Sequence, residues 1–193
     1  SFSGESLVLV LILTAFLAIL LGMDVPTTAS YILASAVAGP ILINLSIPPL
    51  NAHLFIFYFA IMSAITPPVC ASVYAAATIA GENFWKVAGH SVVMAISLYL
   101  IPFLFIFRTG VLMEGTVVDI LYDTAGTAIA VIAITCASAG FALGNLNWPM
   151  RIALYIGGGL MFYPAVWSDA VGATMFVAIA TLSRVHARKV TSD

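Results

Sequence analysis

Between Glu5 and Glu82 the chain carries one charged residue, Asp24. A stretch this long without charge cannot cover a soluble domain, because a folded surface still needs polar side chains that face water. Over the whole chain, 63% of the 193 residues are hydrophobic and 7% are charged, whereas a typical soluble domain has about 25% charged residues. The sequence therefore predicts an all-α integral membrane protein. It argues against a soluble enzyme and, with a net charge of −2, against a nucleic-acid binder.

Two short apolar segments, separated by a polar break, come first in the chain. They cover residues 7–21 and about 26–45. A helix needs about 20 apolar residues to cross the hydrocarbon core, so the first segment is short for a span. We predict a re-entrant helical hairpin over residues 7–45, with two complete crossings as the alternative.

The next apolar segment, residues 51–80, is interrupted by Ser63-Ala64-Ile65-Thr66-Pro67-Pro68. Two adjacent prolines stop a helix because they lack the N–H group and clash with the preceding turn. The pattern predicts a discontinuous transmembrane helix that is broken near its middle. A further helix is expected over residues 87–107, with a kink at Pro102.

In the remaining chain, residues 111–193, we expect extra C-terminal transmembrane helices. They should cover the apolar runs 124–143, 152–167 and 170–182. The sequence thus predicts two parts, residues 1–110 and 111–193. Gly140 and Gly144 have the GxxxG spacing of a helix-packing face, which also arises by coincidence in a glycine-rich chain. The placement of Lys and Arg predicts a cytoplasmic C-terminus, with Arg108 as the one basic residue on the outer side.

The two interruptions resemble each other, since each places small or oxygen-bearing residues before proline. The first is Gly22-Met23-Asp24-Val25-Pro26, and the second is the break at residues 63–68. Each leaves unpaired carbonyl groups at the end of one half-helix and unpaired N–H groups at the start of the next. Carbonyl ends suit a small cation, and N–H ends suit a carboxylate. Paired broken elements of this kind are typical of secondary-transporter sites.

Two residues at these interruptions are open to two interpretations. Thr66 offers a hydroxyl oxygen to a hard cation such as Na⁺, but such a hydroxyl also bonds back to its own helix. Asp24 is either functional, because a charge at membrane depth costs about 2.5–3.5 kcal/mol, or a cap for the helix that begins at Pro26.

The run Gly22-Met23-Asp24-Val25-Pro26-Thr27-Thr28-Ala29, with Thr66-Pro67-Pro68 about 40 residues later, resembles the large membrane subunit of TRAP transporters. It is most similar to the fused permease type that works with TAXI-class binding proteins, and the resemblance covers residues 5–107. It implies a multi-pass, Na⁺-driven permease of the bacterial inner membrane for small carboxylates (organic acids). An extracytoplasmic (periplasmic) solute-binding protein would deliver the substrate.

The resemblance also implies an architecture and a set of ligands. Residues 5–107 would form the second of two inverted repeats in an elevator-type transporter, and other permease segments would supply the first repeat and small-subunit-like helices. One Na⁺ would lie between the hairpin tip and the broken helix, mostly on backbone oxygens, and its ligands would be Gly22, Ser63, Thr66 and Val69. Relatives often carry glycine where this chain has Ser63. The residues beside the carboxylate substrate would be Asp24, Thr27, Thr28 and Pro67.

Two alternative functions remain at this point. The chain could be a non-transporting membrane scaffold subunit whose interruptions serve only packing. It could also be an ion channel, although it offers no ring of charged residues to line a pore.

Overall fold

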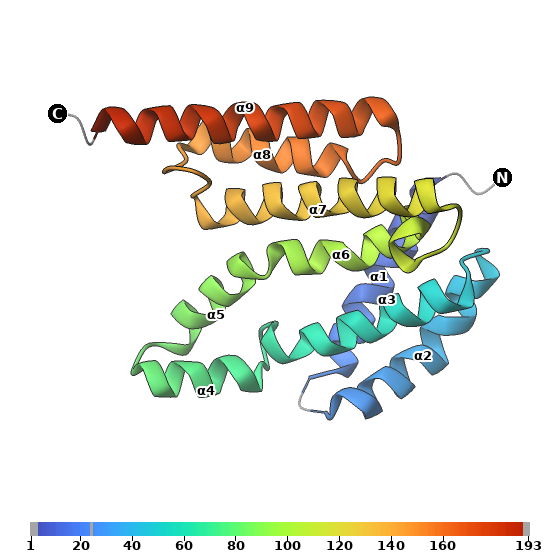
Figure 1. Ribbon diagram of the computed structural model, residues 1–193. Coiled ribbons are helices and arrows are strands. Elements are labelled where there is room, and N and C mark those ends of the chain that lie inside the picture. Colours follow the sequence, from blue (N-terminus) through green and yellow to red (C-terminus); the bar gives the residue numbers. More distant parts are fainter. Residues whose placement is uncertain (1–3, 24, 191–193) are drawn as a thin grey trace. The chain divides into compact units, whose positions relative to one another are not determined.

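A computed structural model describes the backbone of residues 4–23 and 25–190, and the side chains of residues 7–23 and 25–184. In this part of the chain the named elements are nine α-helices and two short 3-10 helices, without a strand (Figure 1). Four described segments are long and apolar enough to cross a membrane: Thr27–Asn44, Phe84–Phe107, Val117–Ala139 and Val166–Arg184. The prediction of an all-α, multi-pass membrane protein is confirmed.

The chain forms two compact units, residues 1–95 and 96–193, and each is described by itself. The predicted functional division after residue 110 remains a prediction, because compactness does not report on function.

The N-terminal unit contains α1 (Gly4–Leu21), α2 (Thr27–Asn44), α3 (Pro49–Met62), η1 (Ser63–Ile65), α4 (Ala71–Ala80) and α5 (Phe84–Met94). Helices α1 and α2 pack against each other and both pack against α3. Local chemistry sets the ends: Pro49 starts α3 at a position that needs no N–H group, and the Asn83 side chain accepts the Trp85 N–H at 2.9 Å to cap α5. Residues 7–45 therefore form the predicted pair of helices, and the predicted interruption between α3 and α4 is present.

The C-terminal unit contains α6 (Ile96–Phe107), η2 (Thr109–Leu112), α7 (Val117–Ala139), α8 (Trp148–Leu160) and α9 (Val166–Val190). Helices α7, α8 and α9 pack against one another around small and apolar side chains that include Ala133, Ala137 and Leu154. Helix α7 begins earlier than the apolar run 124–143 indicated, because Thr116 and Asp119 form a capping box at its start.

The kink expected at Pro102 stays a prediction. Pro102 lies inside α6, and the helix expected over residues 87–107 is interrupted at Ala95. At this point the helix changes neighbours, with α5 packed on α4 and α6 on α7. Gly140 and Gly144 do not form a helix-packing face, because Gly140 ends α7 in the left-handed conformation and Gly144 lies in the turn that follows.

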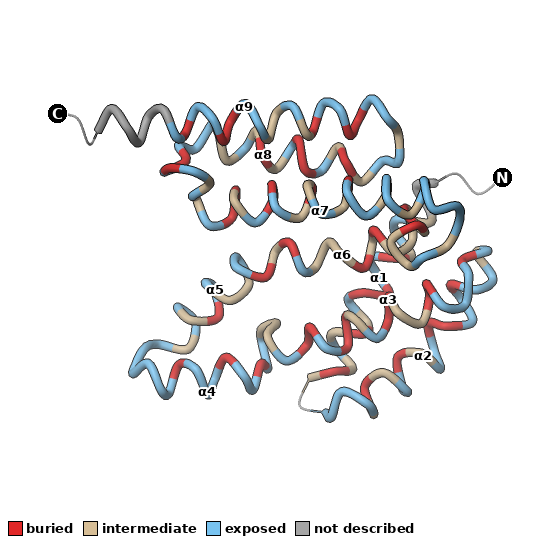
Figure 2. Tube along the Cα trace, in the orientation of Figure 1, coloured by how far each residue is buried: buried red, intermediate tan, exposed pale blue. Residues whose placement is uncertain are grey.

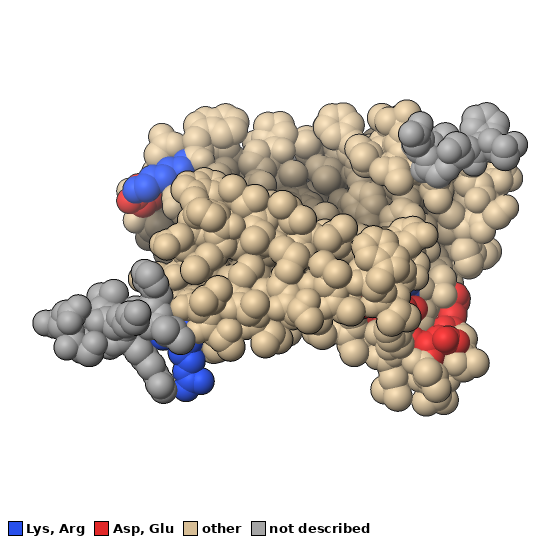
Figure 3. Space-filling model, turned by 90° about the horizontal axis from the view of Figure 1, so that it is seen from above, with Lys and Arg blue, Asp and Glu red and all other residues tan. Residues whose placement is uncertain are grey.

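Exposed side chains are largely apolar, as a membrane environment requires. Buried positions follow one face of most helices, and the other positions are intermediate or exposed (Figure 2). Many large apolar residues are more than half exposed, among them Leu9, Phe16, Ile32 and Val118. Charged side chains are few on the face shown in Figure 3.

Candidate functional site at the hairpin tip and the helix break

The two interruptions that the sequence singles out lie in contact. The Ser63 hydroxyl donates to the carbonyl oxygen of Gly22 at 3.0 Å, although 41 residues separate the two in sequence. Gly22 continues the end of α1, where its N–H group bonds to the carbonyls of Ala18 and Ile19 at 3.1 Å. Ser63 begins η1 directly after α3 and is 3% exposed. A hairpin tip and a helix break therefore meet inside the N-terminal unit.

Gly22 is required at this contact for its lack of a side chain. A Cβ atom at position 22 would lie 2.3 Å from the Ser63 hydroxyl oxygen and 2.9 Å from that of Ser30. Both distances are shorter than any non-bonded contact of a real Cβ atom, so the two interruptions can approach this closely only with glycine. A third residue, Ser30 of α2, therefore also lies beside the tip.

The hydroxyl of Thr66 bonds back to its own helix. Its Oγ1 donates to the carbonyl oxygen of Met62 at 2.6 Å, and its N–H group donates to the carbonyl oxygen of Ser63 at 3.3 Å. The hydrogen bond from Thr66 back to its own helix, one of the two interpretations of this residue, is therefore present. It uses the hydroxyl proton and leaves the oxygen lone pairs, so a back-bonded threonine remains a possible oxygen ligand.

Beyond Thr66 the chain is extended through a cis peptide bond between Pro67 and Pro68 before α4 begins. Val69, the fourth predicted ligand, is 41% exposed. It lines an apolar cavity of about 510 Å³, whose other lining residues are Pro68, Cys70, Ala71, Tyr74 and Phe84. The structure thus brings Gly22, Ser63 and the Thr66 turn together and places the Val69 side chain in the cavity wall.

The predicted substrate residues lie on either side of this contact. Thr27 and Thr28 are exposed in the first turn of α2, which begins after Pro26, an N-cap residue that makes no side-chain cap. Pro67 is half-buried in the break. Asp24 lies outside the described residues.

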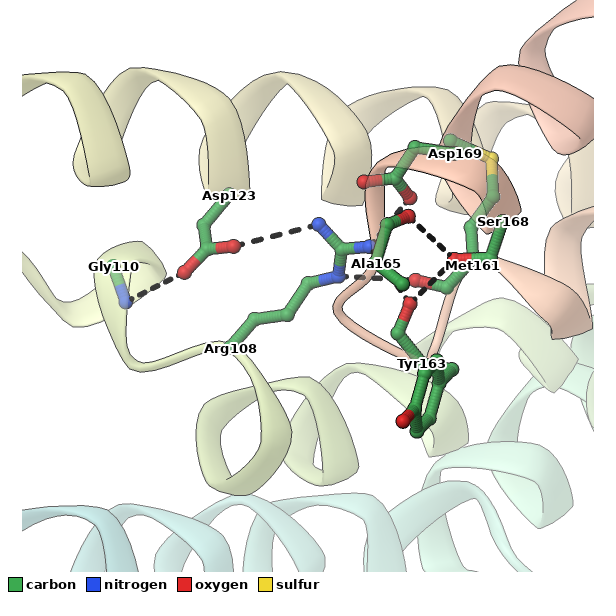
Figure 4. Close-up of polar contacts among 8 residues, drawn as sticks. All are labelled: Arg108, Gly110, Asp123, Met161, Tyr163, Ala165, Ser168 and Asp169. Atoms are coloured by element: carbon green, nitrogen blue, oxygen red, sulfur yellow. Dashed lines mark hydrogen bonds and ion pairs between the residues drawn. The ribbon is translucent and has the colours of Figure 1, made fainter.

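A second polar cluster, around Arg108, was missed by the sequence analysis (Figure 4). The Arg108 side chain is completely buried and forms ion pairs with Asp123 of α7 and Asp169 of α9. Its remaining donors reach two carbonyl oxygens of the α8–α9 connection, those of Met161 at 3.0 Å and Tyr163 at 3.4 Å. The partners of Arg108 are 15 to 61 residues away from it in sequence, so no local sequence motif predicts these contacts.

The fold is that of a multi-pass, all-α membrane protein in which a helical hairpin tip contacts a broken helix. The sequence model of the family "Tripartite ATP-independent periplasmic transporter, DctM component" matches residues 1–120. The chain therefore belongs to this family, which confirms the resemblance to the large membrane subunit of TRAP transporters.

No curated protein and no solved structure matches the chain. The family description defines DctM as one component of a tripartite system. The chain therefore functions in transport together with other components.

Proposed function

We propose that this chain is the part of a sodium-coupled TRAP permease that binds Na⁺ between its hairpin tip and its broken helix. The observation that carries the proposal is the 3.0 Å hydrogen bond between Ser63 and the Gly22 carbonyl. Two interruptions that carry the Gly22 carbonyl and the Ser63 and Thr66 hydroxyls are in contact, and carbonyl and hydroxyl oxygens are the ligands that hard cations prefer. The proposed ligands are Gly22, Ser63, Thr66 and Val69.

The solute is a small carboxylate, an organic acid that a periplasmic solute-binding protein delivers. The first turn of α2 supports this assignment, because its N–H groups carry partial positive charge and its N-cap residue, Pro26, provides no side-chain cap. Thr27 and Thr28 would border the carboxylate there, together with Asp24 and Pro67. Na⁺ bound at the tip favours one arrangement of the hairpin, so differential affinity couples the ion to the solute.

The rest of the proposal concerns assembly. The protein acts in the bacterial inner membrane with its C-terminus in the cytoplasm, and residues 5–107 form the second inverted repeat of an elevator-type transport domain. The other permease segments supply the first repeat and small-subunit-like helices. The association with TAXI-class binding proteins belongs to the same proposal.

The test is uptake by the complete transporter in proteoliposomes, with its binding protein, in the presence and absence of a sodium gradient. Thr66→Val should abolish sodium-dependent uptake while the protein still inserts. Thr78→Val is the matched control, because the Thr78 hydroxyl also bonds back four residues, to Tyr74 at 2.9 Å, but is exposed on α4. Equal uptake by the Thr66 variant and the wild type would remove Thr66 from the ligands. Uptake by the assembled system without this chain would support a scaffold role, and ion currents without saturable solute exchange would support a channel.

A further inference from the structure

Ser30 presents a buried hydroxyl group without a visible partner. The residue is 0% exposed, and its Oγ is one of the few buried side-chain oxygens in the described part of the chain that accept or donate no hydrogen bond. Other buried serines satisfy this group, as Ser138 does with the carbonyl oxygen of Ile134 at 2.9 Å. A buried hydroxyl without a partner is destabilising, because it gives up its hydrogen bonds to water without replacing them. Ser30 is therefore an unfavourable residue here unless something else binds to it.

The unpartnered oxygen of Ser30 lies at the contact between the hairpin tip and the helix break. A Cβ atom placed on Gly22 would meet the hydroxyl oxygens of both Ser30 and Ser63 within 3 Å. These two oxygens therefore lie on the same side of Gly22, where the glycine leaves space. Three elements contribute oxygens here: the end of α1, the first turns of α2, and η1.

Acceptor oxygens outnumber donors at this point. The Ser63 hydroxyl lies 3.0 Å from the Gly22 carbonyl oxygen and 2.7 Å from that of Ala60, but it has one proton for the two. The Ser30 oxygen adds further lone pairs. A small, buried set of neutral oxygens with surplus lone pairs suits a hard, weakly charged cation better than it suits an anion.

We propose that the Ser30 hydroxyl oxygen is an additional ligand of the cation that binds at the hairpin tip. This inference rests on the proposed function in one respect, namely that the cation is Na⁺. It adds a side-chain ligand from α2, which none of the four ligands implied by the family resemblance provides. The ion then joins both arms of the hairpin to the broken helix, so its binding orders the whole tip and not only the end of α1.

The test compares Ser30→Ala with the matched control Ser35→Ala in the complete transporter. Ser35 lies on the same helix, but its hydroxyl bonds to the carbonyl oxygen of Ile32 at 3.1 Å. Two quantities are measured at constant ionic strength, with choline replacing Na⁺: the Na⁺ concentration for half-maximal uptake, and the Na⁺-induced rise in melting temperature in detergent. Removing a ligand should raise the half-maximal concentration by about tenfold and should diminish the thermal shift. Ser35→Ala should change neither quantity.

The outcomes separate this inference from the proposed function. If uptake and melting of the wild type do not respond to Na⁺, the proposed sodium coupling is wrong. If the wild type responds and Ser30→Ala responds at the same Na⁺ concentrations, the Ser30 assignment is wrong. Ser30→Cys provides a second variant of similar size with a sulfur atom that is a poor ligand for Na⁺. It should reproduce the shift, and a wild-type sodium response from this variant would overturn the assignment even if Ser30→Ala fails to insert.

Discussion

Replacing Arg108 by methionine should strongly destabilise the C-terminal unit. The substitution keeps an unbranched side chain about as long as the arginine stem but removes the guanidinium group between Asp123 and Asp169. Two opposite charges about 4 Å apart attract by about 4 kcal/mol at an effective dielectric constant of about 20, although desolvation of the ions offsets much of this. Removal of one partner leaves uncompensated buried charge, which costs about 3–5 kcal/mol.

The surroundings of Arg108 determine where in this range the effect falls. The side chain is 0% exposed and that of Asp169 is 11% exposed, so water cannot easily replace the guanidinium. The carbonyl oxygens of Met161 and Tyr163 would also lose their donor. We therefore expect the upper half of the range, about 4–5 kcal/mol, which raises the unfolded fraction about a thousandfold.

The assay is equilibrium unfolding in detergent micelles, followed by tryptophan fluorescence. Trp148 and Trp167 lie in the C-terminal unit, and a Trp85→Phe background removes the third tryptophan, which lies in the other unit. Arg184→Met is the control, because Arg184 is an exposed cation of α9 and its loss should change the free energy of unfolding by less than about 0.5 kcal/mol.

A double variant tests the reason for the effect. If the cost arises from an unpaired buried carboxylate, then adding Asp169→Asn to Arg108→Met should recover part of the lost stability. A loss below about 1 kcal/mol for the single variant, in the range of a surface ion pair, would refute the assignment of Arg108 as a buried ionic centre. A double variant no more stable than the single one would refute unpaired charge as the cause.

Two glycine substitutions test close packing. Gly22→Ala should push the hairpin tip away from Ser63 and raise the Na⁺ concentration for half-maximal uptake about tenfold or more. Gly89→Ala is the control and should leave this concentration unchanged, because its Cβ would meet nothing within 4 Å. An unchanged sodium dependence in Gly22→Ala would contradict the tip contact. Gly172→Ala should destabilise the C-terminal unit by about 1–3 kcal/mol, because its Cβ would lie 2.7 Å from a carbonyl oxygen of α8. Gly159→Ala is the control, because its Cβ would meet nothing within 4 Å. Equal unfolding midpoints for the two variants would show that α8 and α9 are not tightly packed at Gly172.

The predictable parts of the fold were those governed by local chemistry. The pair of helices over residues 7–45 and the break at Pro67-Pro68 follow from hydropathy, helix length and the missing proline N–H group. Even so, the interruption at Ala95 shows the limit of local rules. Neither proline nor glycine lies there, and the helix is interrupted where its packing partner changes from α4 to α7, which depends on tertiary structure.

The same distinction applies to the candidate site. The sequence motifs identified the two interruptions, and the family resemblance placed Gly22 and Ser63 at one ion. Spacing alone did not show that Ser63 contacts Gly22 directly, or that Ser30 of the second arm lies beside both. These contacts depend on how α1 and α2 pack against α3, and no local pattern encodes that packing.

The Arg108 cluster also bears on how the membrane orientation is inferred. Rules based on Lys and Arg apply to basic residues that remain charged and exposed in loops beside the membrane. Arg108 is completely buried between two carboxylates, so it presents no exposed positive charge to either side. It was the one exception among six basic residues to the predicted orientation. The cytoplasmic C-terminus remains a prediction that rests on the other five basic residues.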